Sequence, residues 1–182
     1  SQARAKTKSY FTAYGSHLAA LPPRLARKLI ATFAPERWWA EDDCFRYLAA
    51  TQGLAFLDAF LAYASSHAEA GLDVLRPYRS PRVAMIAADA LYRLKKKPPG
   101  AKAWLLAHPA AAAIGLVPLA VGPQGKSRDT AEHGLRVLAS EGHEATVMEV
   151  AGRYGEAALV ATRAVLGFDA LDLDPSKIPS LP

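Results

Sequence analysis

The residues whose types and spacing best match a known chemistry lie at positions 120–127, with the sequence AVGPQGKS. This stretch satisfies a relaxed phosphate-loop pattern, in which backbone N–H groups and a lysine surround phosphates and a serine hydroxyl binds magnesium. Pro118 counts against that hypothesis, because such a loop follows a central strand and a central strand excludes proline. We favour a glycine–proline turn into a helix that Ser127 caps. The start of a helix still attracts anions, so Lys126 and Ser127 are candidate anion contacts.

Basic residues form a second candidate site. Residues 1–30 carry six bases and no acid, and residues 31–75 carry two bases and seven acids. Residues 76–128 carry ten bases and one acid, and residues 129–182 carry four bases and nine acids, for a net charge of +5. Clustered bases are typical of a solvated helix end, where cations suit the helix dipole. The alternative is that segment 76–102 contacts nucleic acid. The candidate contacts there are Arg79, Arg82, Arg93, Lys95, Lys96 and Lys97.

Residues that commonly catalyse reactions or bind metals do not converge in this sequence. None of the five histidines stands three or four positions from another, so a zinc site would depend on folding alone. Glu41, Asp42 and Asp43 are consecutive, and consecutive side chains fan around a helix. Cys44 follows these acids, which disfavour a thiolate, and as the only cysteine it favours a reducing compartment. We expect no enzyme activity, no cofactor and no metal.

Apolar residues recur at helical spacing along most of the chain, and proline or glycine separates the segments. Ser80 before Pro81 is a strong start signal, because serine caps helices and proline suits the first turn. Gly71–Arg79 is expected to be a connector. Pro118 is expected to kink or split the helix that begins at Pro109. Helices are expected over residues 4–20, 22–33, 35–48, 53–64, 81–94, 101–108 and 109–121.

Residues 127–166 carry the clearest helical pattern, three short apolar stripes separated at Gly142 and Gly155. No helix of this length buries its stripe alone, so the helices must stack, as in helical-repeat arrays. We therefore predict an all-α fold, a HEAT- or armadillo-like α-α superhelix of short helix pairs, in one domain over residues 1–166. Residues 167–182 are expected to be an extended, proline-containing linker. The stripes are Ala131, Leu135 and Leu138, then Val147, Val150, Ala151 and Tyr154, then Leu159, Thr162 and Leu166.

Composition and hydropathy indicate a globular protein that makes no membrane contact. Apolar residues make up 51% of the chain, which is typical of a globular protein. The longest apolar run, residues 109–121, is too short to span a bilayer, so we expect a buried core helix. Residues 1–10 contain neither an initiator methionine nor a signal-type segment. We expect a piece of a longer, cytoplasmic protein.

The residues after Ala103 resemble a known group of proteins. Trp104–Ala113, WLLAHPAAAA, then Gly115–Pro118, GLVP, and Ala151–Gly155, AGRYG, are similar to segments of large bacterial WGR-domain or molybdate metabolism regulator-like proteins. Those proteins carry a C-terminal domain of unknown function, and the ending KIPSLP at residues 177–182 fits the same resemblance. The resemblance implies the helical-repeat middle region of a multidomain protein and brings no catalytic residues.

The function that we predict is a non-catalytic helical-repeat scaffold or protein-interaction region. Its partner is expected to be another domain of the same polypeptide or a separate protein. One alternative is a nucleic-acid-associated regulatory module that uses segment 76–102, and a steep fall of affinity with salt would identify it. A second alternative is a phosphate-loop-like nucleotide binder at residues 120–127, which magnesium-dependent protection by ATP would identify.

Overall fold

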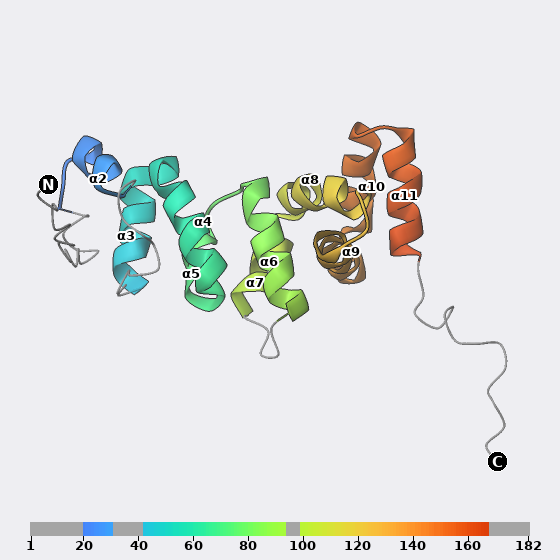
Figure 1. Cartoon of the computed structure of the whole chain (residues 1–182), viewed down its shortest axis with the longest axis horizontal. Helices are drawn as coiled ribbons and strands as arrows, with labels where there is room; N and C mark the ends of the chain where they lie inside the picture. The colour runs from blue at the N-terminus through green and yellow to red at the C-terminus, as the bar shows by residue number, and fades with distance from the viewer. Residues whose placement is uncertain (1–19, 31–41, 94–98, 168–182) are drawn as a thin grey trace, which may run out of the picture. The chain divides into compact units, whose positions relative to one another are not determined.

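The computed structural model describes residues 20–30, 42–93 and 99–167. Every regular element that these residues form is a helix, so the predicted all-α fold is confirmed (Figure 1). The chain divides into two compact units, Ser1–Leu75 and Arg76–Pro182. The single domain over residues 1–166 and the HEAT- or armadillo-like superhelix stay predictions, because compact units can still fold as one domain. The expected linker lies outside the described residues from position 168 onward.

The helices of the first unit pack around a small aromatic and aliphatic core. Phe56 and Phe60 are fully buried, with ring centroids 6.0 Å apart, and Leu72 of α5 is fully buried as well. The helix expected to start at Gly53 begins instead with a 3₁₀ turn, which the α-helix follows. The elements are α2 (Pro23–Ile30), α3 (Asp42–Gln52), the 3₁₀ turn η2 (Gly53–Phe56), α4 (Leu57–Ser66) and α5 (Ala68–Leu75).

The connector expected at Gly71–Arg79 is wrong over its first half, because α5 extends through Gly71 to Leu75. Gly71 acts there as a packing contact between helices. A Cβ atom at this position would lie 2.3 Å from the Cα of Ala64, so glycine lets α5 approach α4 at close range. A glycine that looks like a helix breaker in the sequence is therefore explained by a contact with another helix.

The second unit is built around α8. Its elements are α6 (Pro81–Arg93), α7 (Pro99–Ala107), α8 (Pro109–Ala120), α9 (Lys126–Leu138), the π-helical turn η3 (Ala139–His143), α10 (Glu144–Arg153) and α11 (Glu156–Leu166). Helix α8 packs against α6, α9 and α10, and the small side chains Ala112 and Ala113 are fully buried in that packing (Figure 1). The expected buried core helix over residues 109–121 is therefore confirmed.

The start signal at Ser80 and Pro81 is confirmed, since the backbone N–H of Arg82 donates to Ser80 Oγ at 3.4 Å and α6 begins at Pro81. The expected split at Pro118 is wrong, because α8 continues through Pro118 to Ala120. Proline lacks an N–H, so the carbonyl of Ile114 loses its helical partner. That carbonyl accepts a hydrogen bond of 3.0 Å from the hydroxyl of Tyr154 instead.

The first two stripes of residues 127–166 face the core as expected, except at Tyr154. In the third stripe Thr162 is buried, but Leu159 and Leu166 are only half-buried, and Val165 is buried instead. Leu135, Leu138 and Val147 are fully buried, and the helices end near Gly142 and Gly155, whose φ angles are +88° and +105°. Tyr154 is 48% exposed, and its hydroxyl donates to the carbonyl of Ile114 in α8. Among the described residues no single helix is long and apolar enough to cross a membrane. Helices α7 and α8 taken together are long and apolar enough to match a membrane span, but the two are bent by 101° at the break between them.

Candidate interaction groove

The basic residues proposed for nucleic-acid contact do not form one surface of unpaired cations. Arg79 and Arg82 are exposed. Arg93 pairs with Asp89 one turn earlier on α6, and this hydrogen bond and charge raise the pKa of Arg93. Lys95, Lys96 and Lys97 lie outside the described residues. Lys102, at the end of the same segment, donates to Glu141 Oε1 at 2.6 Å, so acids neutralise part of this segment.

The phosphate-loop pattern lies between two helices. Val117–Ala120 belongs to α8, where a phosphate loop requires a strand, so the nucleotide-binding alternative gains no support from this geometry. The capping role assigned to Ser127 is wrong, because Gly125 is the N-cap of α9 and no side chain caps it. Glycine suits this position because its φ of +150° disfavours other residues. Lys126 and Ser127 are both exposed at the start of α9.

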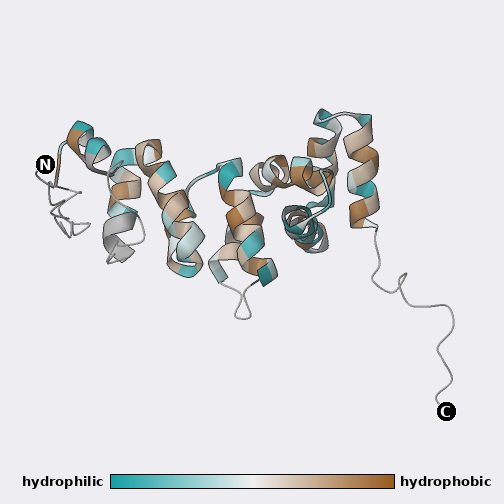
Figure 2. Ribbon diagram, viewed as in Figure 1, coloured by the Kyte–Doolittle hydropathy of each residue, from teal (hydrophilic) through white to brown (hydrophobic). Residues whose placement is uncertain are grey.

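The described residues of the second unit form an open groove of about 620 Å³ between α9, α11 and the end of α6. Charged side chains of α9 line it on one side and small apolar side chains of α11 on the other, and Tyr92 of α6 also lines it. Much of α9 is hydrophilic in Figure 2, in contrast to the apolar α8 beside it. The lining residues are Tyr92, Arg128, Asp129, Glu132, His133, Arg136, Ala161, Ala164 and Val165.

An arginine–glutamate–arginine row holds the charged wall in place. Arg128 Nε donates to Glu132 Oε1 at 2.7 Å, and a terminal nitrogen of Arg136 donates to Glu132 Oε2 at 3.0 Å. The three residues stand four positions apart, so they follow one face of α9. The Glu132 side chain is only 17% exposed, which strengthens both ion pairs relative to pairs in open water. The row is therefore a fixed part of the wall with one excess positive charge.

Arg136 also joins the two walls of the groove. Its Nε donates to the backbone carbonyl of Val165 at 3.0 Å. The last carbonyls of an α-helix have no partner inside the helix, so this bond satisfies one of them at the end of α11. Arg128 makes a similar bond of 3.3 Å to the carbonyl of Gly122, in the loop before α9. The groove is thus held by side chains and does not depend on helix packing alone.

The ring of His133 packs against Tyr92, which lies at the end of α6. The ring centroids are 5.6 Å apart and the planes are tilted by 51°. This contact connects α6 to the charged wall of α9. None of the groove residues belongs to the candidate sites that the sequence indicates. The four-residue spacing of Arg128, Glu132 and Arg136 was the one signal that could have indicated the row, because such spacing places charges on one helix face.

The groove combines paired charged side chains with small apolar ones. Glu132 is engaged by two arginines, so its carboxylate is poorly placed to transfer protons. The described residues contain no group of three or more His, Cys, Asp or Glu side chains arranged to hold a metal ion. Arginines on one wall and small apolar side chains on the other suit a peptide that carries both polar and apolar groups.

Comparison with protein families, with curated proteins and with solved structures finds no match for this chain. The resemblance to WGR-domain proteins therefore stays a prediction.

Proposed function

We propose that this chain is a non-catalytic helical scaffold that binds a protein segment in the groove between α9 and α11. The segment belongs to another domain of the same polypeptide or to a separate protein. The observation that carries this proposal is the groove itself, whose charged wall is fixed by Glu132 and whose two walls are joined by Arg136. A site held by locked side chains on helices binds with little loss of conformational entropy.

The composition of the groove favours a protein segment over nucleic acid. Asp129 and Glu132 both line it and would repel phosphates, whereas a peptide carries N–H groups and apolar side chains that these walls accommodate. Outside the groove, Arg93 and Lys102 are paired with acids of this chain. Contact of segment 76–102 with nucleic acid stays a prediction, and a steep fall of affinity between low and high salt would distinguish it.

The test is site-specific photo-crosslinking in the cells from which the chain comes. A benzophenone amino acid replaces Ala164 in the groove or, as a control, the exposed Glu144 at the start of α10. We expect the Ala164 position to give a discrete crosslinked product, within the chain or with another protein. The Glu144 position should give at most diffuse background. Equal products from both positions, or none from either, would overturn the proposal.

A further inference from the structure

We propose that a second copy of this chain packs on the outward face of α11, with the two α11 helices antiparallel, and covers the groove beside it. This inference rests on the proposed function of the groove as a site for a protein partner, and it names that partner. Helix α11 lies at the edge of the second unit, and its inner side packs against α8, α9 and α10 (Figure 1). Its outer side is exposed in the described part of the chain.

The outward face of α11 is apolar, whereas a helix face in contact with water is usually polar. Ala157, Val160 and Ala164 are exposed and stand three and four positions apart, so they share one side of the helix. Val160 alone is 55% exposed. The buried residues of the same helix, Thr162 and Val165, lie on a different side. Apolar side chains on two sides of one helix are typical of a helix that is covered from both.

The spacing on this face is that of a contact between paired helices. In heptad notation, Ala157, Val160 and Ala164 take the inner positions a, d and a. Two antiparallel copies with the two-fold axis beside Val160 place Ala157 of each copy next to Ala164 of the other. Alanine side chains are small, so the two backbones can approach closely, and Val160 packs against its own copy at the centre.

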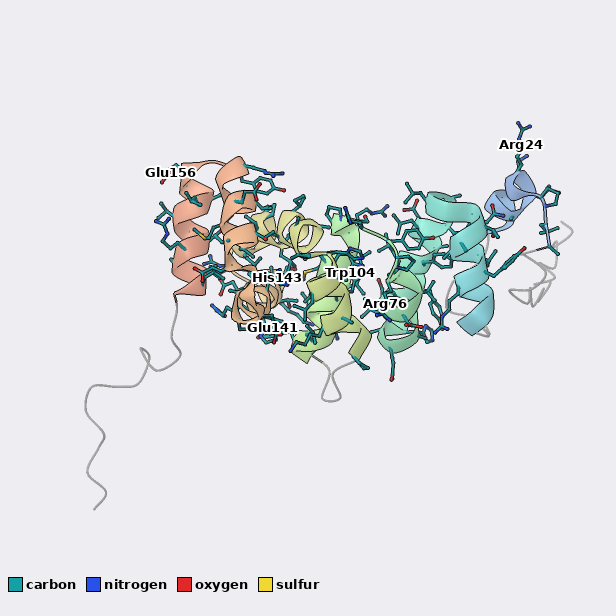
Figure 3. The ribbon with its side chains drawn as sticks, turned by 180° about the vertical axis from the view of Figure 1, so that it is seen from behind. Arg24, Arg76, Trp104, Glu141, His143 and Glu156 are labelled. Atoms are coloured by element: carbon teal, nitrogen blue, oxygen red, sulfur yellow. The ribbon has the colours of Figure 1, made fainter. Side chains whose placement is uncertain are left out.

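The charges beside this face are complementary between two antiparallel copies. Glu156 and Arg163 stand seven positions apart, so they lie on one flank of α11, at the g positions of the heptads. Both are exposed, and neither forms an ion pair with a residue that the structure describes (Figure 3). A two-fold axis perpendicular to the helices keeps the same flank on the same side. Glu156 of each copy therefore meets Arg163 of the other, and two such pairs form.

The groove has the charge balance that a contact with its own copy needs. Its lining holds as many acids as arginines, so it favours neither an acidic nor a basic partner. A patch that meets its own copy must be complementary to itself, and a balanced patch avoids repulsion between the copies. Ala164 belongs both to the outward face and to the lining, so a helix packed on that face also covers the groove. The acids and arginines are Arg128, Asp129, Glu132 and Arg136.

The first experiment measures the dimer by sedimentation equilibrium of the purified full chain. Because α11 has 11 residues, the contact is smaller than the interface of a stable dimer, and we expect a dissociation constant of about 10–100 μM. Glu156→Arg or Arg163→Glu brings like charges together at both pairs, and each should weaken the dimer about tenfold. The two changes combined should restore the parent constant within about threefold. The helix dipole disfavours both exchanged charges, so restoration reports the contact between copies.

The second experiment tests the position of the two-fold axis. Cys44, the only cysteine of the chain, is changed to serine, and Val160→Cys then places a thiol beside its own copy. We expect mild oxidation to give a disulfide-linked dimer. The matched control is Leu119→Cys, at an exposed aliphatic position on α8, where linkage should be at least about tenfold slower. Glu149→Arg, a charge reversal on the exposed surface of α10, is the control for the sedimentation series and should leave the dissociation constant unchanged.

A chain that sediments as a monomer at every concentration up to about 1 mM would overturn the inference. If position 164 still crosslinks to another protein in cells, the proposed function of the groove then stands without it. A dimer that ignores both charge reversals, or that links Leu119→Cys as fast as Val160→Cys, has its contact elsewhere and overturns the inference as well. A monomer whose position 164 gives no product in cells would overturn the proposed function too.

Discussion

The hydroxyl of Tyr154, at the end of α10, donates a hydrogen bond of 3.0 Å to the backbone carbonyl of Ile114 in α8. This carbonyl is the one that Pro118 leaves without its usual partner, because proline has no N–H to donate four residues later. The phenol thus completes the hydrogen bonding of α8 from 40 positions away. An exposed tyrosine on one helix thus offsets a hydrogen bond that a proline removes from another.

We predict that Tyr154→Phe lowers the free energy of unfolding by about 1 kcal/mol, the typical net value of one hydrogen bond. When Pro118 is also changed to alanine, Tyr154→Phe should lower the free energy of unfolding by less, because residue 118 then supplies an N–H to the Ile114 carbonyl. Urea denaturation of the two single variants and the double variant measures this coupling. Strictly additive effects would show that the proline and the phenol are independent.

Replacing glycine by alanine should lower the stability of the protein at Gly115 and raise it at Gly152. A Cβ atom at Gly115 would lie 2.4 Å from the carbonyl oxygen of Pro81 and 2.8 Å from the Cβ of Ala84, so α8 and α6 must separate. We expect Gly115→Ala to destabilise the protein by about 1–3 kcal/mol through overpacking. At Gly152 the nearest atom is 4.0 Å away, and alanine should stabilise α10 by about 0.5–1 kcal/mol. Thermal unfolding distinguishes the two signs, and a stabilised Gly115→Ala variant would contradict this packing.

Trp104 carries a buried hydrogen bond that phenylalanine cannot make. The side chain is fully buried in the second unit (Figure 3), and its Nε1–H donates to the carbonyl of Tyr78 at 3.1 Å. Trp104→Phe removes this donor and part of the packed volume, and we expect a loss of about 1–3 kcal/mol. Tyr92→Phe changes an exposed aromatic residue and should stay within about 0.5 kcal/mol of the parent. Similar losses in both variants, measured by urea denaturation, would argue against a specific role for the indole.

Glu132→Gln should be more costly than Glu149→Gln. Glu132 accepts from two arginines and its side chain is 17% exposed, whereas the pair of Glu149 and Arg153 is about two-thirds exposed. We expect a loss of about 1–2 kcal/mol for Glu132→Gln and close to zero for Glu149→Gln, because solvent screens the second pair. Added salt should narrow the difference only slightly. Equal unfolding free energies for the two variants would mean that the row does not hold the groove wall.

Ser127→Asp and Lys126→Ala should both be tolerated. Ser127 is exposed in the first turn of α9, where a negative charge suits the helix dipole and adds about 0.3–1 kcal/mol. Lys126 is exposed at the first position of the helix, and its removal should leave stability unchanged. We expect no shift in melting temperature when ATP and magnesium are added. A saturable stabilisation by ATP that disappears in Lys126→Ala would instead favour the nucleotide-binding alternative.

The parts of the fold that the sequence predicts are those set by local physics. The spacing of Ala131, Leu135 and Leu138 repeats with the period of a helix, and these residues are fully buried. Ser80 and Pro81 define a helix start through their own backbone preferences, and the apolar run at residues 109–121 is a core helix. Such signals need only neighbouring residues, so they can be read without knowledge of the tertiary structure.

Tertiary structure alone decided the roles of residues whose partners are distant in the chain. Gly71 lets α5 approach α4 closely, and the exposed Tyr154 donates to the carbonyl of Ile114 on another helix, which Pro118 leaves without its helical partner. The groove joins Tyr92 with residues 128–136 and 161–165, and no local pattern encodes that meeting. Helical periodicity indicates which face of a helix is buried. Which other helix covers that face depends on contacts between residues far apart in the sequence. The sequence by itself therefore determined the helices, and their packing decided the site.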